Sequence, residues 1–246
     1  MSNNERPTIV LVHGAWADGS SWSRAVALLQ NEGFSVQVAP NPLRGIAADS
    51  QYLIDYLSTF DVPIVLVGHS YGGVVISNAA TRTRNVRALI YVDAFLPDEG
   101  ETLAQLAGAV PGSVLAPAIA DPTSVFTLRP FPGAPEGVFD SYVRPEVFVS
   151  GFAADLSREE ANGLAAAQMP LATSAVEEAS GAPAWRTLPS WVLIGTNDRV
   201  IPAAGQAFMA ERADAQVDEV DASHLSMVSH PDEVVAFVRK AADSVA

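Results

Sequence analysis

The chain of 246 residues contains no cysteine. This excludes disulfide bonds, thiolate metal sites and a cysteine nucleophile, and it fits a reducing compartment. The N-terminus is polar and predicts no signal peptide, so we expect a cytoplasmic protein. No HExxH motif or similar spacing of ligands occurs, so neither a metal nor a cofactor is expected.

Basic residues are scarce: 14 Lys and Arg stand against 28 Asp and Glu, which gives a formal net charge of −14. Without a basic stripe, nucleic acid is not expected as a partner. One stretch, residues 102–120, carries no charge, but Pro111 and Pro117 interrupt it and basic flanks are absent. It therefore predicts no membrane span.

Short runs rich in Val, Ile and Leu alternate with stretches of helical periodicity. Several runs are continuously apolar, which is typical of strands covered on both faces in a parallel sheet. This alternation predicts an α/β fold with an open, mostly parallel, doubly wound sheet and helices on both faces. The expected strands are 8–12, 35–39, 63–67, 87–92, 191–195 and 216–221, and the expected helices are 21–31, 47–60, 71–82, 203–213 and 231–242.

The alternation stops between Phe95 and Trp185, where prolines recur and only short helical candidates such as 158–168 remain. A connection this long between two strands is too large for a plain crossover. We expect a cap inserted over the sheet at 95–185, between an N-terminal part of the core at 1–94 and a C-terminal part at 186–246.

A Gly-x-Ser-x-Gly pattern, GHSYG, follows the expected strand 63–67 and precedes an expected helix. Such a sharp turn holds its serine, Ser70, in a strained conformation above the sheet edge. Gly68 and Gly72 lack side chains that would collide in the bend. The free N–H groups of the helix N-terminus favour a developing negative charge, so Ser70 is predicted as a nucleophile.

A serine nucleophile needs a base that an acid orients. Of the four histidines, His224 follows the last expected strand at the same sheet edge as Ser70, and it is the predicted base. Asp198 follows the strand 191–195 and is the predicted acid. Asp93, at the end of the strand 87–92, is the alternative, with hydrogen bonding in the pocket floor as its other role. The order Ser, acid, His is the one expected in this fold.

The reaction also needs donors for an oxyanion. We expect them to be the N–H of Tyr71, directly after the nucleophile, and one from the loop HGAWADGSSW after the first strand. Gly14 lets this backbone approach closely, and the N–H of Ala15 is the predicted second donor. The alternative for this loop is a tight turn in which Trp16 packs against the lid.

The motifs VLVHGAWADGSSW, VLVGHSYGG, GTNDRVIP and DASHLSM resemble those of the α/β-hydrolases. The resemblance is to small bacterial esterases related to the plant methylesterases and hydroxynitrile lyases, and it is weak in the cap. It implies a six-stranded parallel core. It also implies Ser70, Asp198 and His224 as the triad and Ala15 and Tyr71 as the oxyanion hole.

Two positions depart from the lyases of that branch, which carry Thr in place of Gly14 and Lys in place of Leu225. Both groups handle the nitrile and the alcohol in lyase chemistry, so a lyase is disfavoured. Asp93 places a charge where a small neutral residue is expected.

The sequence thus predicts a serine carboxylesterase that acts through an acyl-enzyme on Ser70. We expect a small to medium apolar ester as its partner, and a monomer or homodimer. The expected substrate-binding residues are Gly14, Trp16, Asp93, Phe126 and Leu225, with Phe131 and Leu164 in the cap lining. The alternatives are a ligand-binding receptor that keeps the hydrolase shell, or lactone opening, C–C hydrolysis, perhydrolysis or hydroxynitrile cleavage on the same triad.

Overall fold

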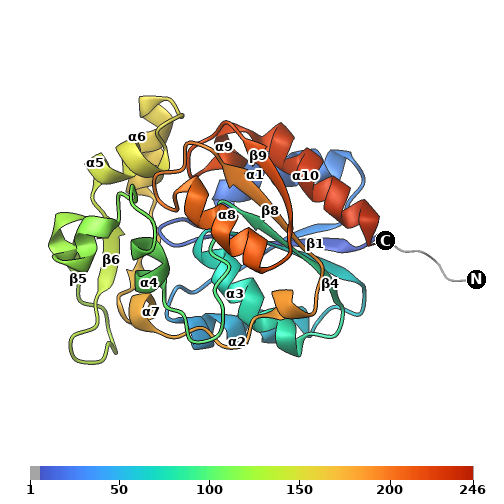
Figure 1. The fold of residues 1–246 in the computed structure, drawn as a ribbon, viewed down its shortest axis with the longest axis horizontal. Coiled ribbons are helices and arrows are strands. Elements are labelled where there is room, and N and C mark those ends of the chain that lie inside the picture. The colour runs from blue at the N-terminus through green and yellow to red at the C-terminus, as the bar shows by residue number, and fades with distance from the viewer. Residues whose placement is uncertain (1–5, 246) are drawn as a thin grey trace, which may run out of the picture.

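The computed structural model describes residues 6–245, and a six-stranded sheet is its centre (Figure 1). The strand order is β2-β1-β3-β4-β8-β9, and every neighbouring pair is parallel. The strands are β1 (Thr8–Val12), β2 (Val36–Ala39), β3 (Ile64–His69), β4 (Val86–Val92), β8 (Ser190–Gly195) and β9 (Gln216–Val220). This confirms the predicted doubly wound α/β fold.

Burial along the strands follows their position in the sheet. Every residue of β1, β3 and β8 is buried, as continuous apolar runs require when both faces are covered. The edge strand β9 instead exposes its first four residues and buries only Val220. Two of the exposed side chains are Asp218 and Glu219, and charges on an edge strand discourage pairing with another chain.

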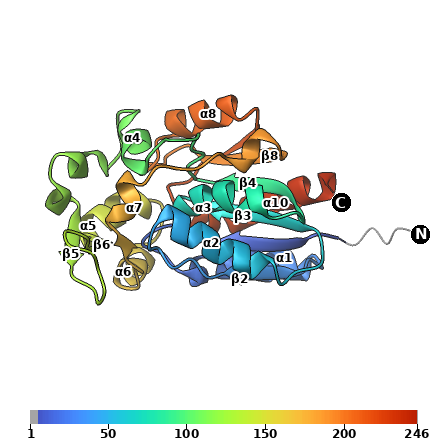
Figure 2. The ribbon, with the colours of Figure 1, turned by 90° about the horizontal axis from the view of Figure 1, so that it is seen from below.

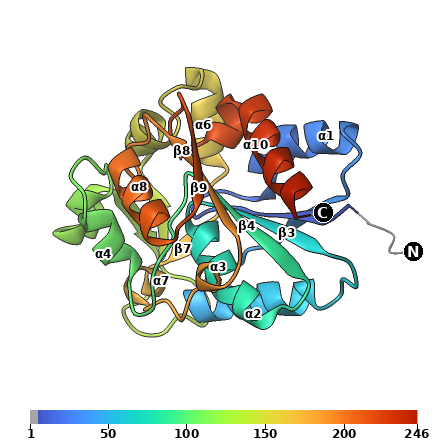
Figure 3. The same ribbon diagram turned by 45° about the vertical axis from the view of Figure 1, so that its right-hand side comes forward.

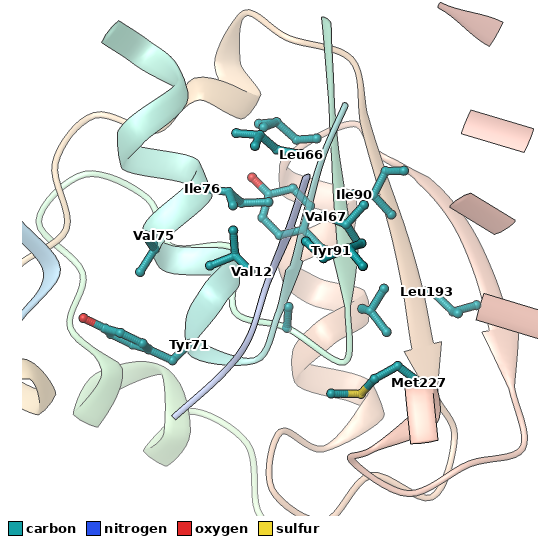
Figure 4. Packing of buried hydrophobic residues seen from close by; sticks show 14 of the residues in the cluster. Val12, Leu66, Val67, Tyr71, Val75, Ile76, Ile90, Tyr91, Leu193 and Met227 are labelled. Carbon is teal, nitrogen blue, oxygen red and sulfur yellow. The ribbon is translucent and has the colours of Figure 1, made fainter. Parts of the chain in front are cut away.

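Helices cover both faces of the sheet. Helices α1 and α10 lie on one face, and α2 and α3 lie on the other (Figure 3). Figure 4 shows this second layer from close by, with Ile76 of α3 beside Leu66 and Tyr91 of the sheet. The helices of the core are α1 (Ser23–Asn31), α2 (Ile46–Leu57), α3 (Tyr71–Ala79), α8 (Ala203–Arg212), α9 (Ser226–Ser229) and α10 (Pro231–Ser244).

Two expected helices are divided in the structure. The segment predicted as one helix over 21–31 is a 3₁₀ turn, η1 (Gly19–Trp22), followed by α1. The side chain of Asp18 accepts a hydrogen bond from the N–H of Ser20 and so begins η1. The helix predicted over 71–82 is α3 followed by a second 3₁₀ turn, η2 (Ala80–Arg82).

The cap lies between β4 and β8, at the carboxyl ends of the sheet strands and away from the chain termini (Figures 1 and 2). It contains an antiparallel sheet in the order β5-β6-β7, which the sequence did not predict. Its other elements are short helices and turns. The cap elements are α4 (Leu103–Gly108), η3 (Ala116–Ile119), η4 (Pro122–Ser124), β5 (Phe126–Arg129), β6 (Asp140–Val143), α5 (Pro145–Val147), the π-helix η5 (Phe148–Phe152), α6 (Arg158–Ala166), β7 (Leu171–Ala172), α7 (Ser174–Glu177) and η6 (Ala184–Arg186).

The predicted division into 1–94, 95–185 and 186–246 stays a prediction. Strand β4 ends at Val92 and strand β8 begins at Ser190, so the inserted segment and the two parts of the core meet near those limits. Across residues 6–245, no helix combines the length and the hydropathy that crossing a membrane would need.

Candidate active site

Ser70 forms the turn between β3 and α3. Its backbone has φ 51° and ψ −121°, a left-handed conformation that is strained for a residue with a side chain. A Cβ on Gly68 would lie 2.7 Å from the backbone carbon of Gly72, so the bend closes only with glycine there. A Cβ on Gly72 would lie 2.5 Å from the carbonyl oxygen of Val12, so its glycine allows α3 to approach β1.

The structure brings Ser70, His224 and Asp198 together. Nε2 of His224 lies 2.9 Å from Oγ of Ser70, and Nδ1 lies 2.8 Å from Oδ2 of Asp198. Because a carboxylate accepts hydrogen bonds, Nδ1 carries the imidazole hydrogen and Nε2 is free to accept one from the serine hydroxyl. All three side chains are buried.

The carboxylate of Asp198 accepts from three further donors. The backbone N–H groups of Val200 and Ile201 lie 2.7 and 3.0 Å from Oδ1, and Nε2 of Gln206 lies 2.8 Å from Oδ2. Gln206 comes from α8 and did not follow from any motif. Its amide N–H donates to the same oxygen of Asp198 that accepts from His224, and this second bond fixes the plane of the carboxylate.

Burial sets the charge preferences of this pair. It raises the pKa of Asp198 well above its ordinary value, while the N–H groups of Ile201 and Val200 and the Gln206 amide act in the opposite direction. It lowers the pKa of His224 to about 3. A neutral imidazole, the form that can accept a proton, is therefore the stable state near pH 7.

Asp93 lies beneath the site and does not contact His224. Its Oδ1 accepts from the N–H of Gly195, and its Oδ2 accepts from the N–H and the hydroxyl of Ser226, at 2.9, 3.1 and 2.6 Å. Burial, and then the charge of Asp198, raise the pKa of Asp93 well above its ordinary value. Asp93 is fully buried and ties the end of β8 to the start of α9, so the structure does not place it on a substrate-binding wall.

The backbone N–H groups of Ala15 and Tyr71, beside Ser70, have no acceptor within the described residues. Both residues are buried, and both line the cavity that holds Ser70. Gly14 brings the Ala15 loop this close, because a Cβ there would lie 2.7 Å from Cβ of Ser70 and 2.8 Å from Nδ1 of His69. The pair can serve a developing oxyanion.

Trp16 joins this loop to the cap. Its φ is 55°, and its indole N–H donates to the carbonyl oxygen of Ser141 in β6 at 3.0 Å. The ring stacks on Phe126 with 5.1 Å between centroids and meets the edge of Phe152 at 5.7 Å. These cap contacts hold a backbone conformation that is rare for tryptophan.

A cavity of about 280 Å³ opens above Ser70 between the sheet edge and the cap. Its wall is mainly apolar, and Ser141, Thr173 and Glu177 add polar groups. A cavity of this size and character suits a small to medium apolar ligand with few polar contacts. Residues of the apolar wall include Trp16, Phe95, Leu103, Leu115, Phe126 and Leu171.

The remaining predicted lining residues lie elsewhere. Leu225 and Leu164 border a much smaller cavity of about 20 Å³. Phe131 packs under the Arg44 guanidinium, 4.8 Å from its ring centroid. Over residues 6–245, no group of three or more His, Asp or Glu side chains is arranged to hold a metal ion.

The alpha/beta hydrolase family matches residues 9–237. The chain belongs to this family. The match runs through the nucleophile turn, the Asp198 loop and the His224 loop alike.

Relatives in sequence include proteins named as esterases. Carbendazim hydrolyzing esterase of Nocardioides sp. (strain SG-4G) is 36% identical over 121 residues, which cover 44% of this chain. The matched stretch spans half the length of that relative. Methylesterase 7 of Arabidopsis thaliana is 25% identical over the whole of both chains. The predicted resemblance to the plant methylesterases is confirmed.

The crystal structure of polyneuridine aldehyde esterase has the same fold. It superposes with a TM-score of 0.80 at 19% identity, covering 96% of this chain and 99% of the other. The likeness includes the cap as well as the sheet, since so little of either chain is left uncovered.

Proposed function

We propose that this chain is a serine carboxylesterase whose nucleophile is Ser70. The observation that carries the proposal is the hydrogen-bonded series Ser70, His224 and Asp198 at the floor of an apolar cavity, beside two N–H groups without an acceptor in the described chain. The names of the relatives, a carbendazim hydrolyzing esterase and a methylesterase, support ester cleavage.

In the first half-reaction, Oγ of Ser70 attacks the ester carbonyl while Nε2 of His224 takes the hydroxyl proton. The N–H groups of Ala15 and Tyr71 donate to the oxygen that becomes negative. Asp198 accepts from Nδ1–H and stabilises the imidazolium. When the tetrahedral intermediate collapses, the C–O bond to the alcohol breaks and His224 returns the proton to the leaving alkoxide.

The second half-reaction repeats this sequence with water. His224 takes a proton from the water as its oxygen attacks the acyl-enzyme, and it then protonates Oγ of Ser70 as the acid leaves. None of these steps calls for a metal or a cofactor. The apolar wall favours small to medium acyl or aryl groups, and we propose neutral esters of that size as substrates.

A series of p-nitrophenyl esters with acyl chains of increasing length tests this proposal. Ser70→Ala should fold normally and lose nearly all activity, and a fluorophosphonate should label the natural chain but not this variant. Ser77→Ala is the matched control, because Ser77 lies in α3, the helix that follows Ser70, and donates to the carbonyl of Gly73 instead of lining the cavity. Full activity in Ser70→Ala would contradict the proposal.

The same experiment separates the alternatives. A single slow turnover with a retained acyl group would indicate a ligand-binding receptor. Faster turnover of lactones or β-diketones than of any ester would indicate another reaction on the same residues.

A further inference from the structure

His69 is the last residue of β3 and the immediate neighbour of Ser70. Its imidazole is 1% exposed. Its Nε2 lies 2.8 Å from the backbone carbonyl oxygen of His224, and the two rings are 4.8 Å apart. On its other edge, Nδ1 faces Gly14, where an added Cβ would lie only 2.8 Å away. One side chain thus touches the His224 loop and the loop that carries Ala15.

The contacts of this imidazole decide its tautomer. A carbonyl oxygen can only accept, so Nε2 of His69 carries the hydrogen and donates it. Nδ1 is then an acceptor, and it is buried without a partner in the described part of the chain. A buried polar atom without a partner costs free energy, and an apolar side chain of similar size would avoid that cost. What His69 provides in return is the hydrogen bond to His224.

The loop around His224 is tied at several points, and most of them lie on neighbouring residues. The N–H of Asn197 donates to the carbonyl of Ala222 at 3.0 Å, and the N–H of Ser223 donates to Asp155 of the cap at 2.9 Å. Within residues 6–245, the bond from His69 is the only one that reaches the backbone of His224 itself.

The ring of His224 is also held between two others. His69 lies on one side, and the edge of Phe152 meets it with 5.2 Å between centroids. The hydrogen bond that Asp198 accepts from Nδ1–H therefore does not position His224 alone. The contact with His69 sets where the backbone of His224 lies, and the two rings set the orientation of its imidazole. Both are needed for Nε2 to meet Oγ of Ser70 at 2.9 Å.

We propose that His69 is a positioning residue for the base. Its Nε2–H fixes the His224 backbone relative to Ser70, because His69 and Ser70 are consecutive residues of one strained turn. The inference rests on the proposed esterase function for its kinetic consequences, but the tautomer and the hydrogen bond do not depend on it.

His69 is suited to this role only while it stays neutral in this tautomer. Burial, together with the neighbouring His224 and His13, lowers the pKa of His69 well below its ordinary value. The titratable groups that face His224 are Asp198 at its Nδ1 and His69 from the nucleophile turn. Asp93 accepts from Gly195 and from Ser226, which lies two residues beyond His224.

Two variants separate positioning from filling space. His69→Leu fills the cavity without a donor and should lower kcat by about tenfold or more, with KM within about twofold, because a net hydrogen bond and the alignment of the base are lost. The acid limb of its kcat/KM profile should move toward the ordinary range of imidazole as His224 becomes hydrated. His69→Gln keeps an N–H donor on a side chain of comparable reach and should recover part of kcat and of the pH profile.

Tyr91→Phe is the matched control. Tyr91 is also fully buried, in the neighbouring strand β4, and its hydroxyl pairs with Ser77 away from the site. Tyr91→Phe should lower the free energy of unfolding in urea but leave kcat and the acid limb of the kcat/KM profile unchanged. If His69→Leu behaves like Tyr91→Phe, with lower stability and natural kcat and pH profile, His69 only fills space and the proposal is overturned.

Nitrogen-15 NMR of labelled histidines gives a readout that needs neither a folded leucine variant nor activity. The His69 signals, identified by their absence from His69→Gln, should show the neutral Nε2–H tautomer at pH 6–8. An Nδ1–H tautomer or a charged ring would overturn the proposal. Failure of the esterase proposal would appear separately, as activity that survives Ser70→Ala.

Discussion

Replacing Asp198 with Asn should reduce kcat by about 10⁴-fold, or ~5.4 kcal/mol at 1.36 kcal/mol for each factor of ten. The reason is that the two oxygens of the Asp198 carboxylate accept from different donors among the four that it contacts. Val200 and Ile201 donate to Oδ1, so the Asn carbonyl should occupy that place. The new NH₂ group then faces the donors at Oδ2, from His224 and Gln206.

The consequence is a change of tautomer. Nδ1 of His224 must accept from the Asn amide, so the imidazole hydrogen moves to Nε2, which points at Ser70. Nε2–H cannot take the proton of the serine hydroxyl. KM should change little, because Asp198 does not line the cavity.

The assay is steady-state hydrolysis of p-nitrophenyl butyrate by Asp198→Asn and by Asp93→Asn, the other acid that the sequence offered. Asp93 accepts from Gly195 and Ser226 but not from His224. Its variant should lose ~1–3 kcal/mol of unfolding free energy and keep kcat within about tenfold of the natural chain. If Asp198→Asn keeps more than about a tenth of the natural kcat while Asp93→Asn loses nearly all of it, Asp93 is the acid that orients His224 and the assignment of Asp198 is wrong.

Three further results are expected. Burial lowers the pKa of His224 to about 3, and only the neutral imidazole accepts a proton. We therefore expect kcat/KM to stay constant as the pH falls through 6.5 and to decline only well below it. A decline of kcat/KM with its midpoint at pH 6.5 would contradict this. Gly73→Ala should lower the unfolding free energy in urea by ~1–3 kcal/mol, since its Cβ would press on the carbonyl of Phe95 and lie 2.9 Å from Cβ of Ala94. Gly163→Ala, in a helix with open space around it, is its control and should be neutral or stabilising. Glu177→Gln should raise kcat/KM for a hemisuccinate ester about three- to tenfold and leave a neutral ester unchanged, since a carboxylate on the cavity wall repels another; equal changes for both esters would argue against it.

The parts of the site that the sequence predicted are those that local patterns encode. Ser70 stands in a turn whose glycines are two residues away on either side, and Asp198 and His224 follow strands whose carboxyl ends meet at one sheet edge. Their roles stay predictions that the kinetic variants test, but their place at one edge follows from a parallel sheet alone.

What could not be predicted depends on contacts between distant segments. The bond between Trp16 and Ser141 spans 125 residues, and the bond from His69 to His224 spans 155. The cap strands β5 and β6 are only four residues long and lie between prolines, such as Pro130 after β5 and Pro145 after β6, so no periodicity marks them. The position of Asp93 at the end of a strand predicts a pocket residue, yet its partners are Gly195 and Ser226 and it does not line the cavity.

The link from Trp16 to Ser141 has a consequence for how selectivity in this enzyme can change. Cap residues that shape the cavity also contact Trp16 and hold the loop that carries the proposed oxyanion donor Ala15. Exchanging the cap with that of a relative would therefore change the cavity wall and the contacts of this loop at the same time. Contacts that shape the substrate range therefore also influence the turnover rate. Engineering that keeps Ser141, Phe126 and Phe152 while varying α4 and α7 offers the way to alter the first without losing the second.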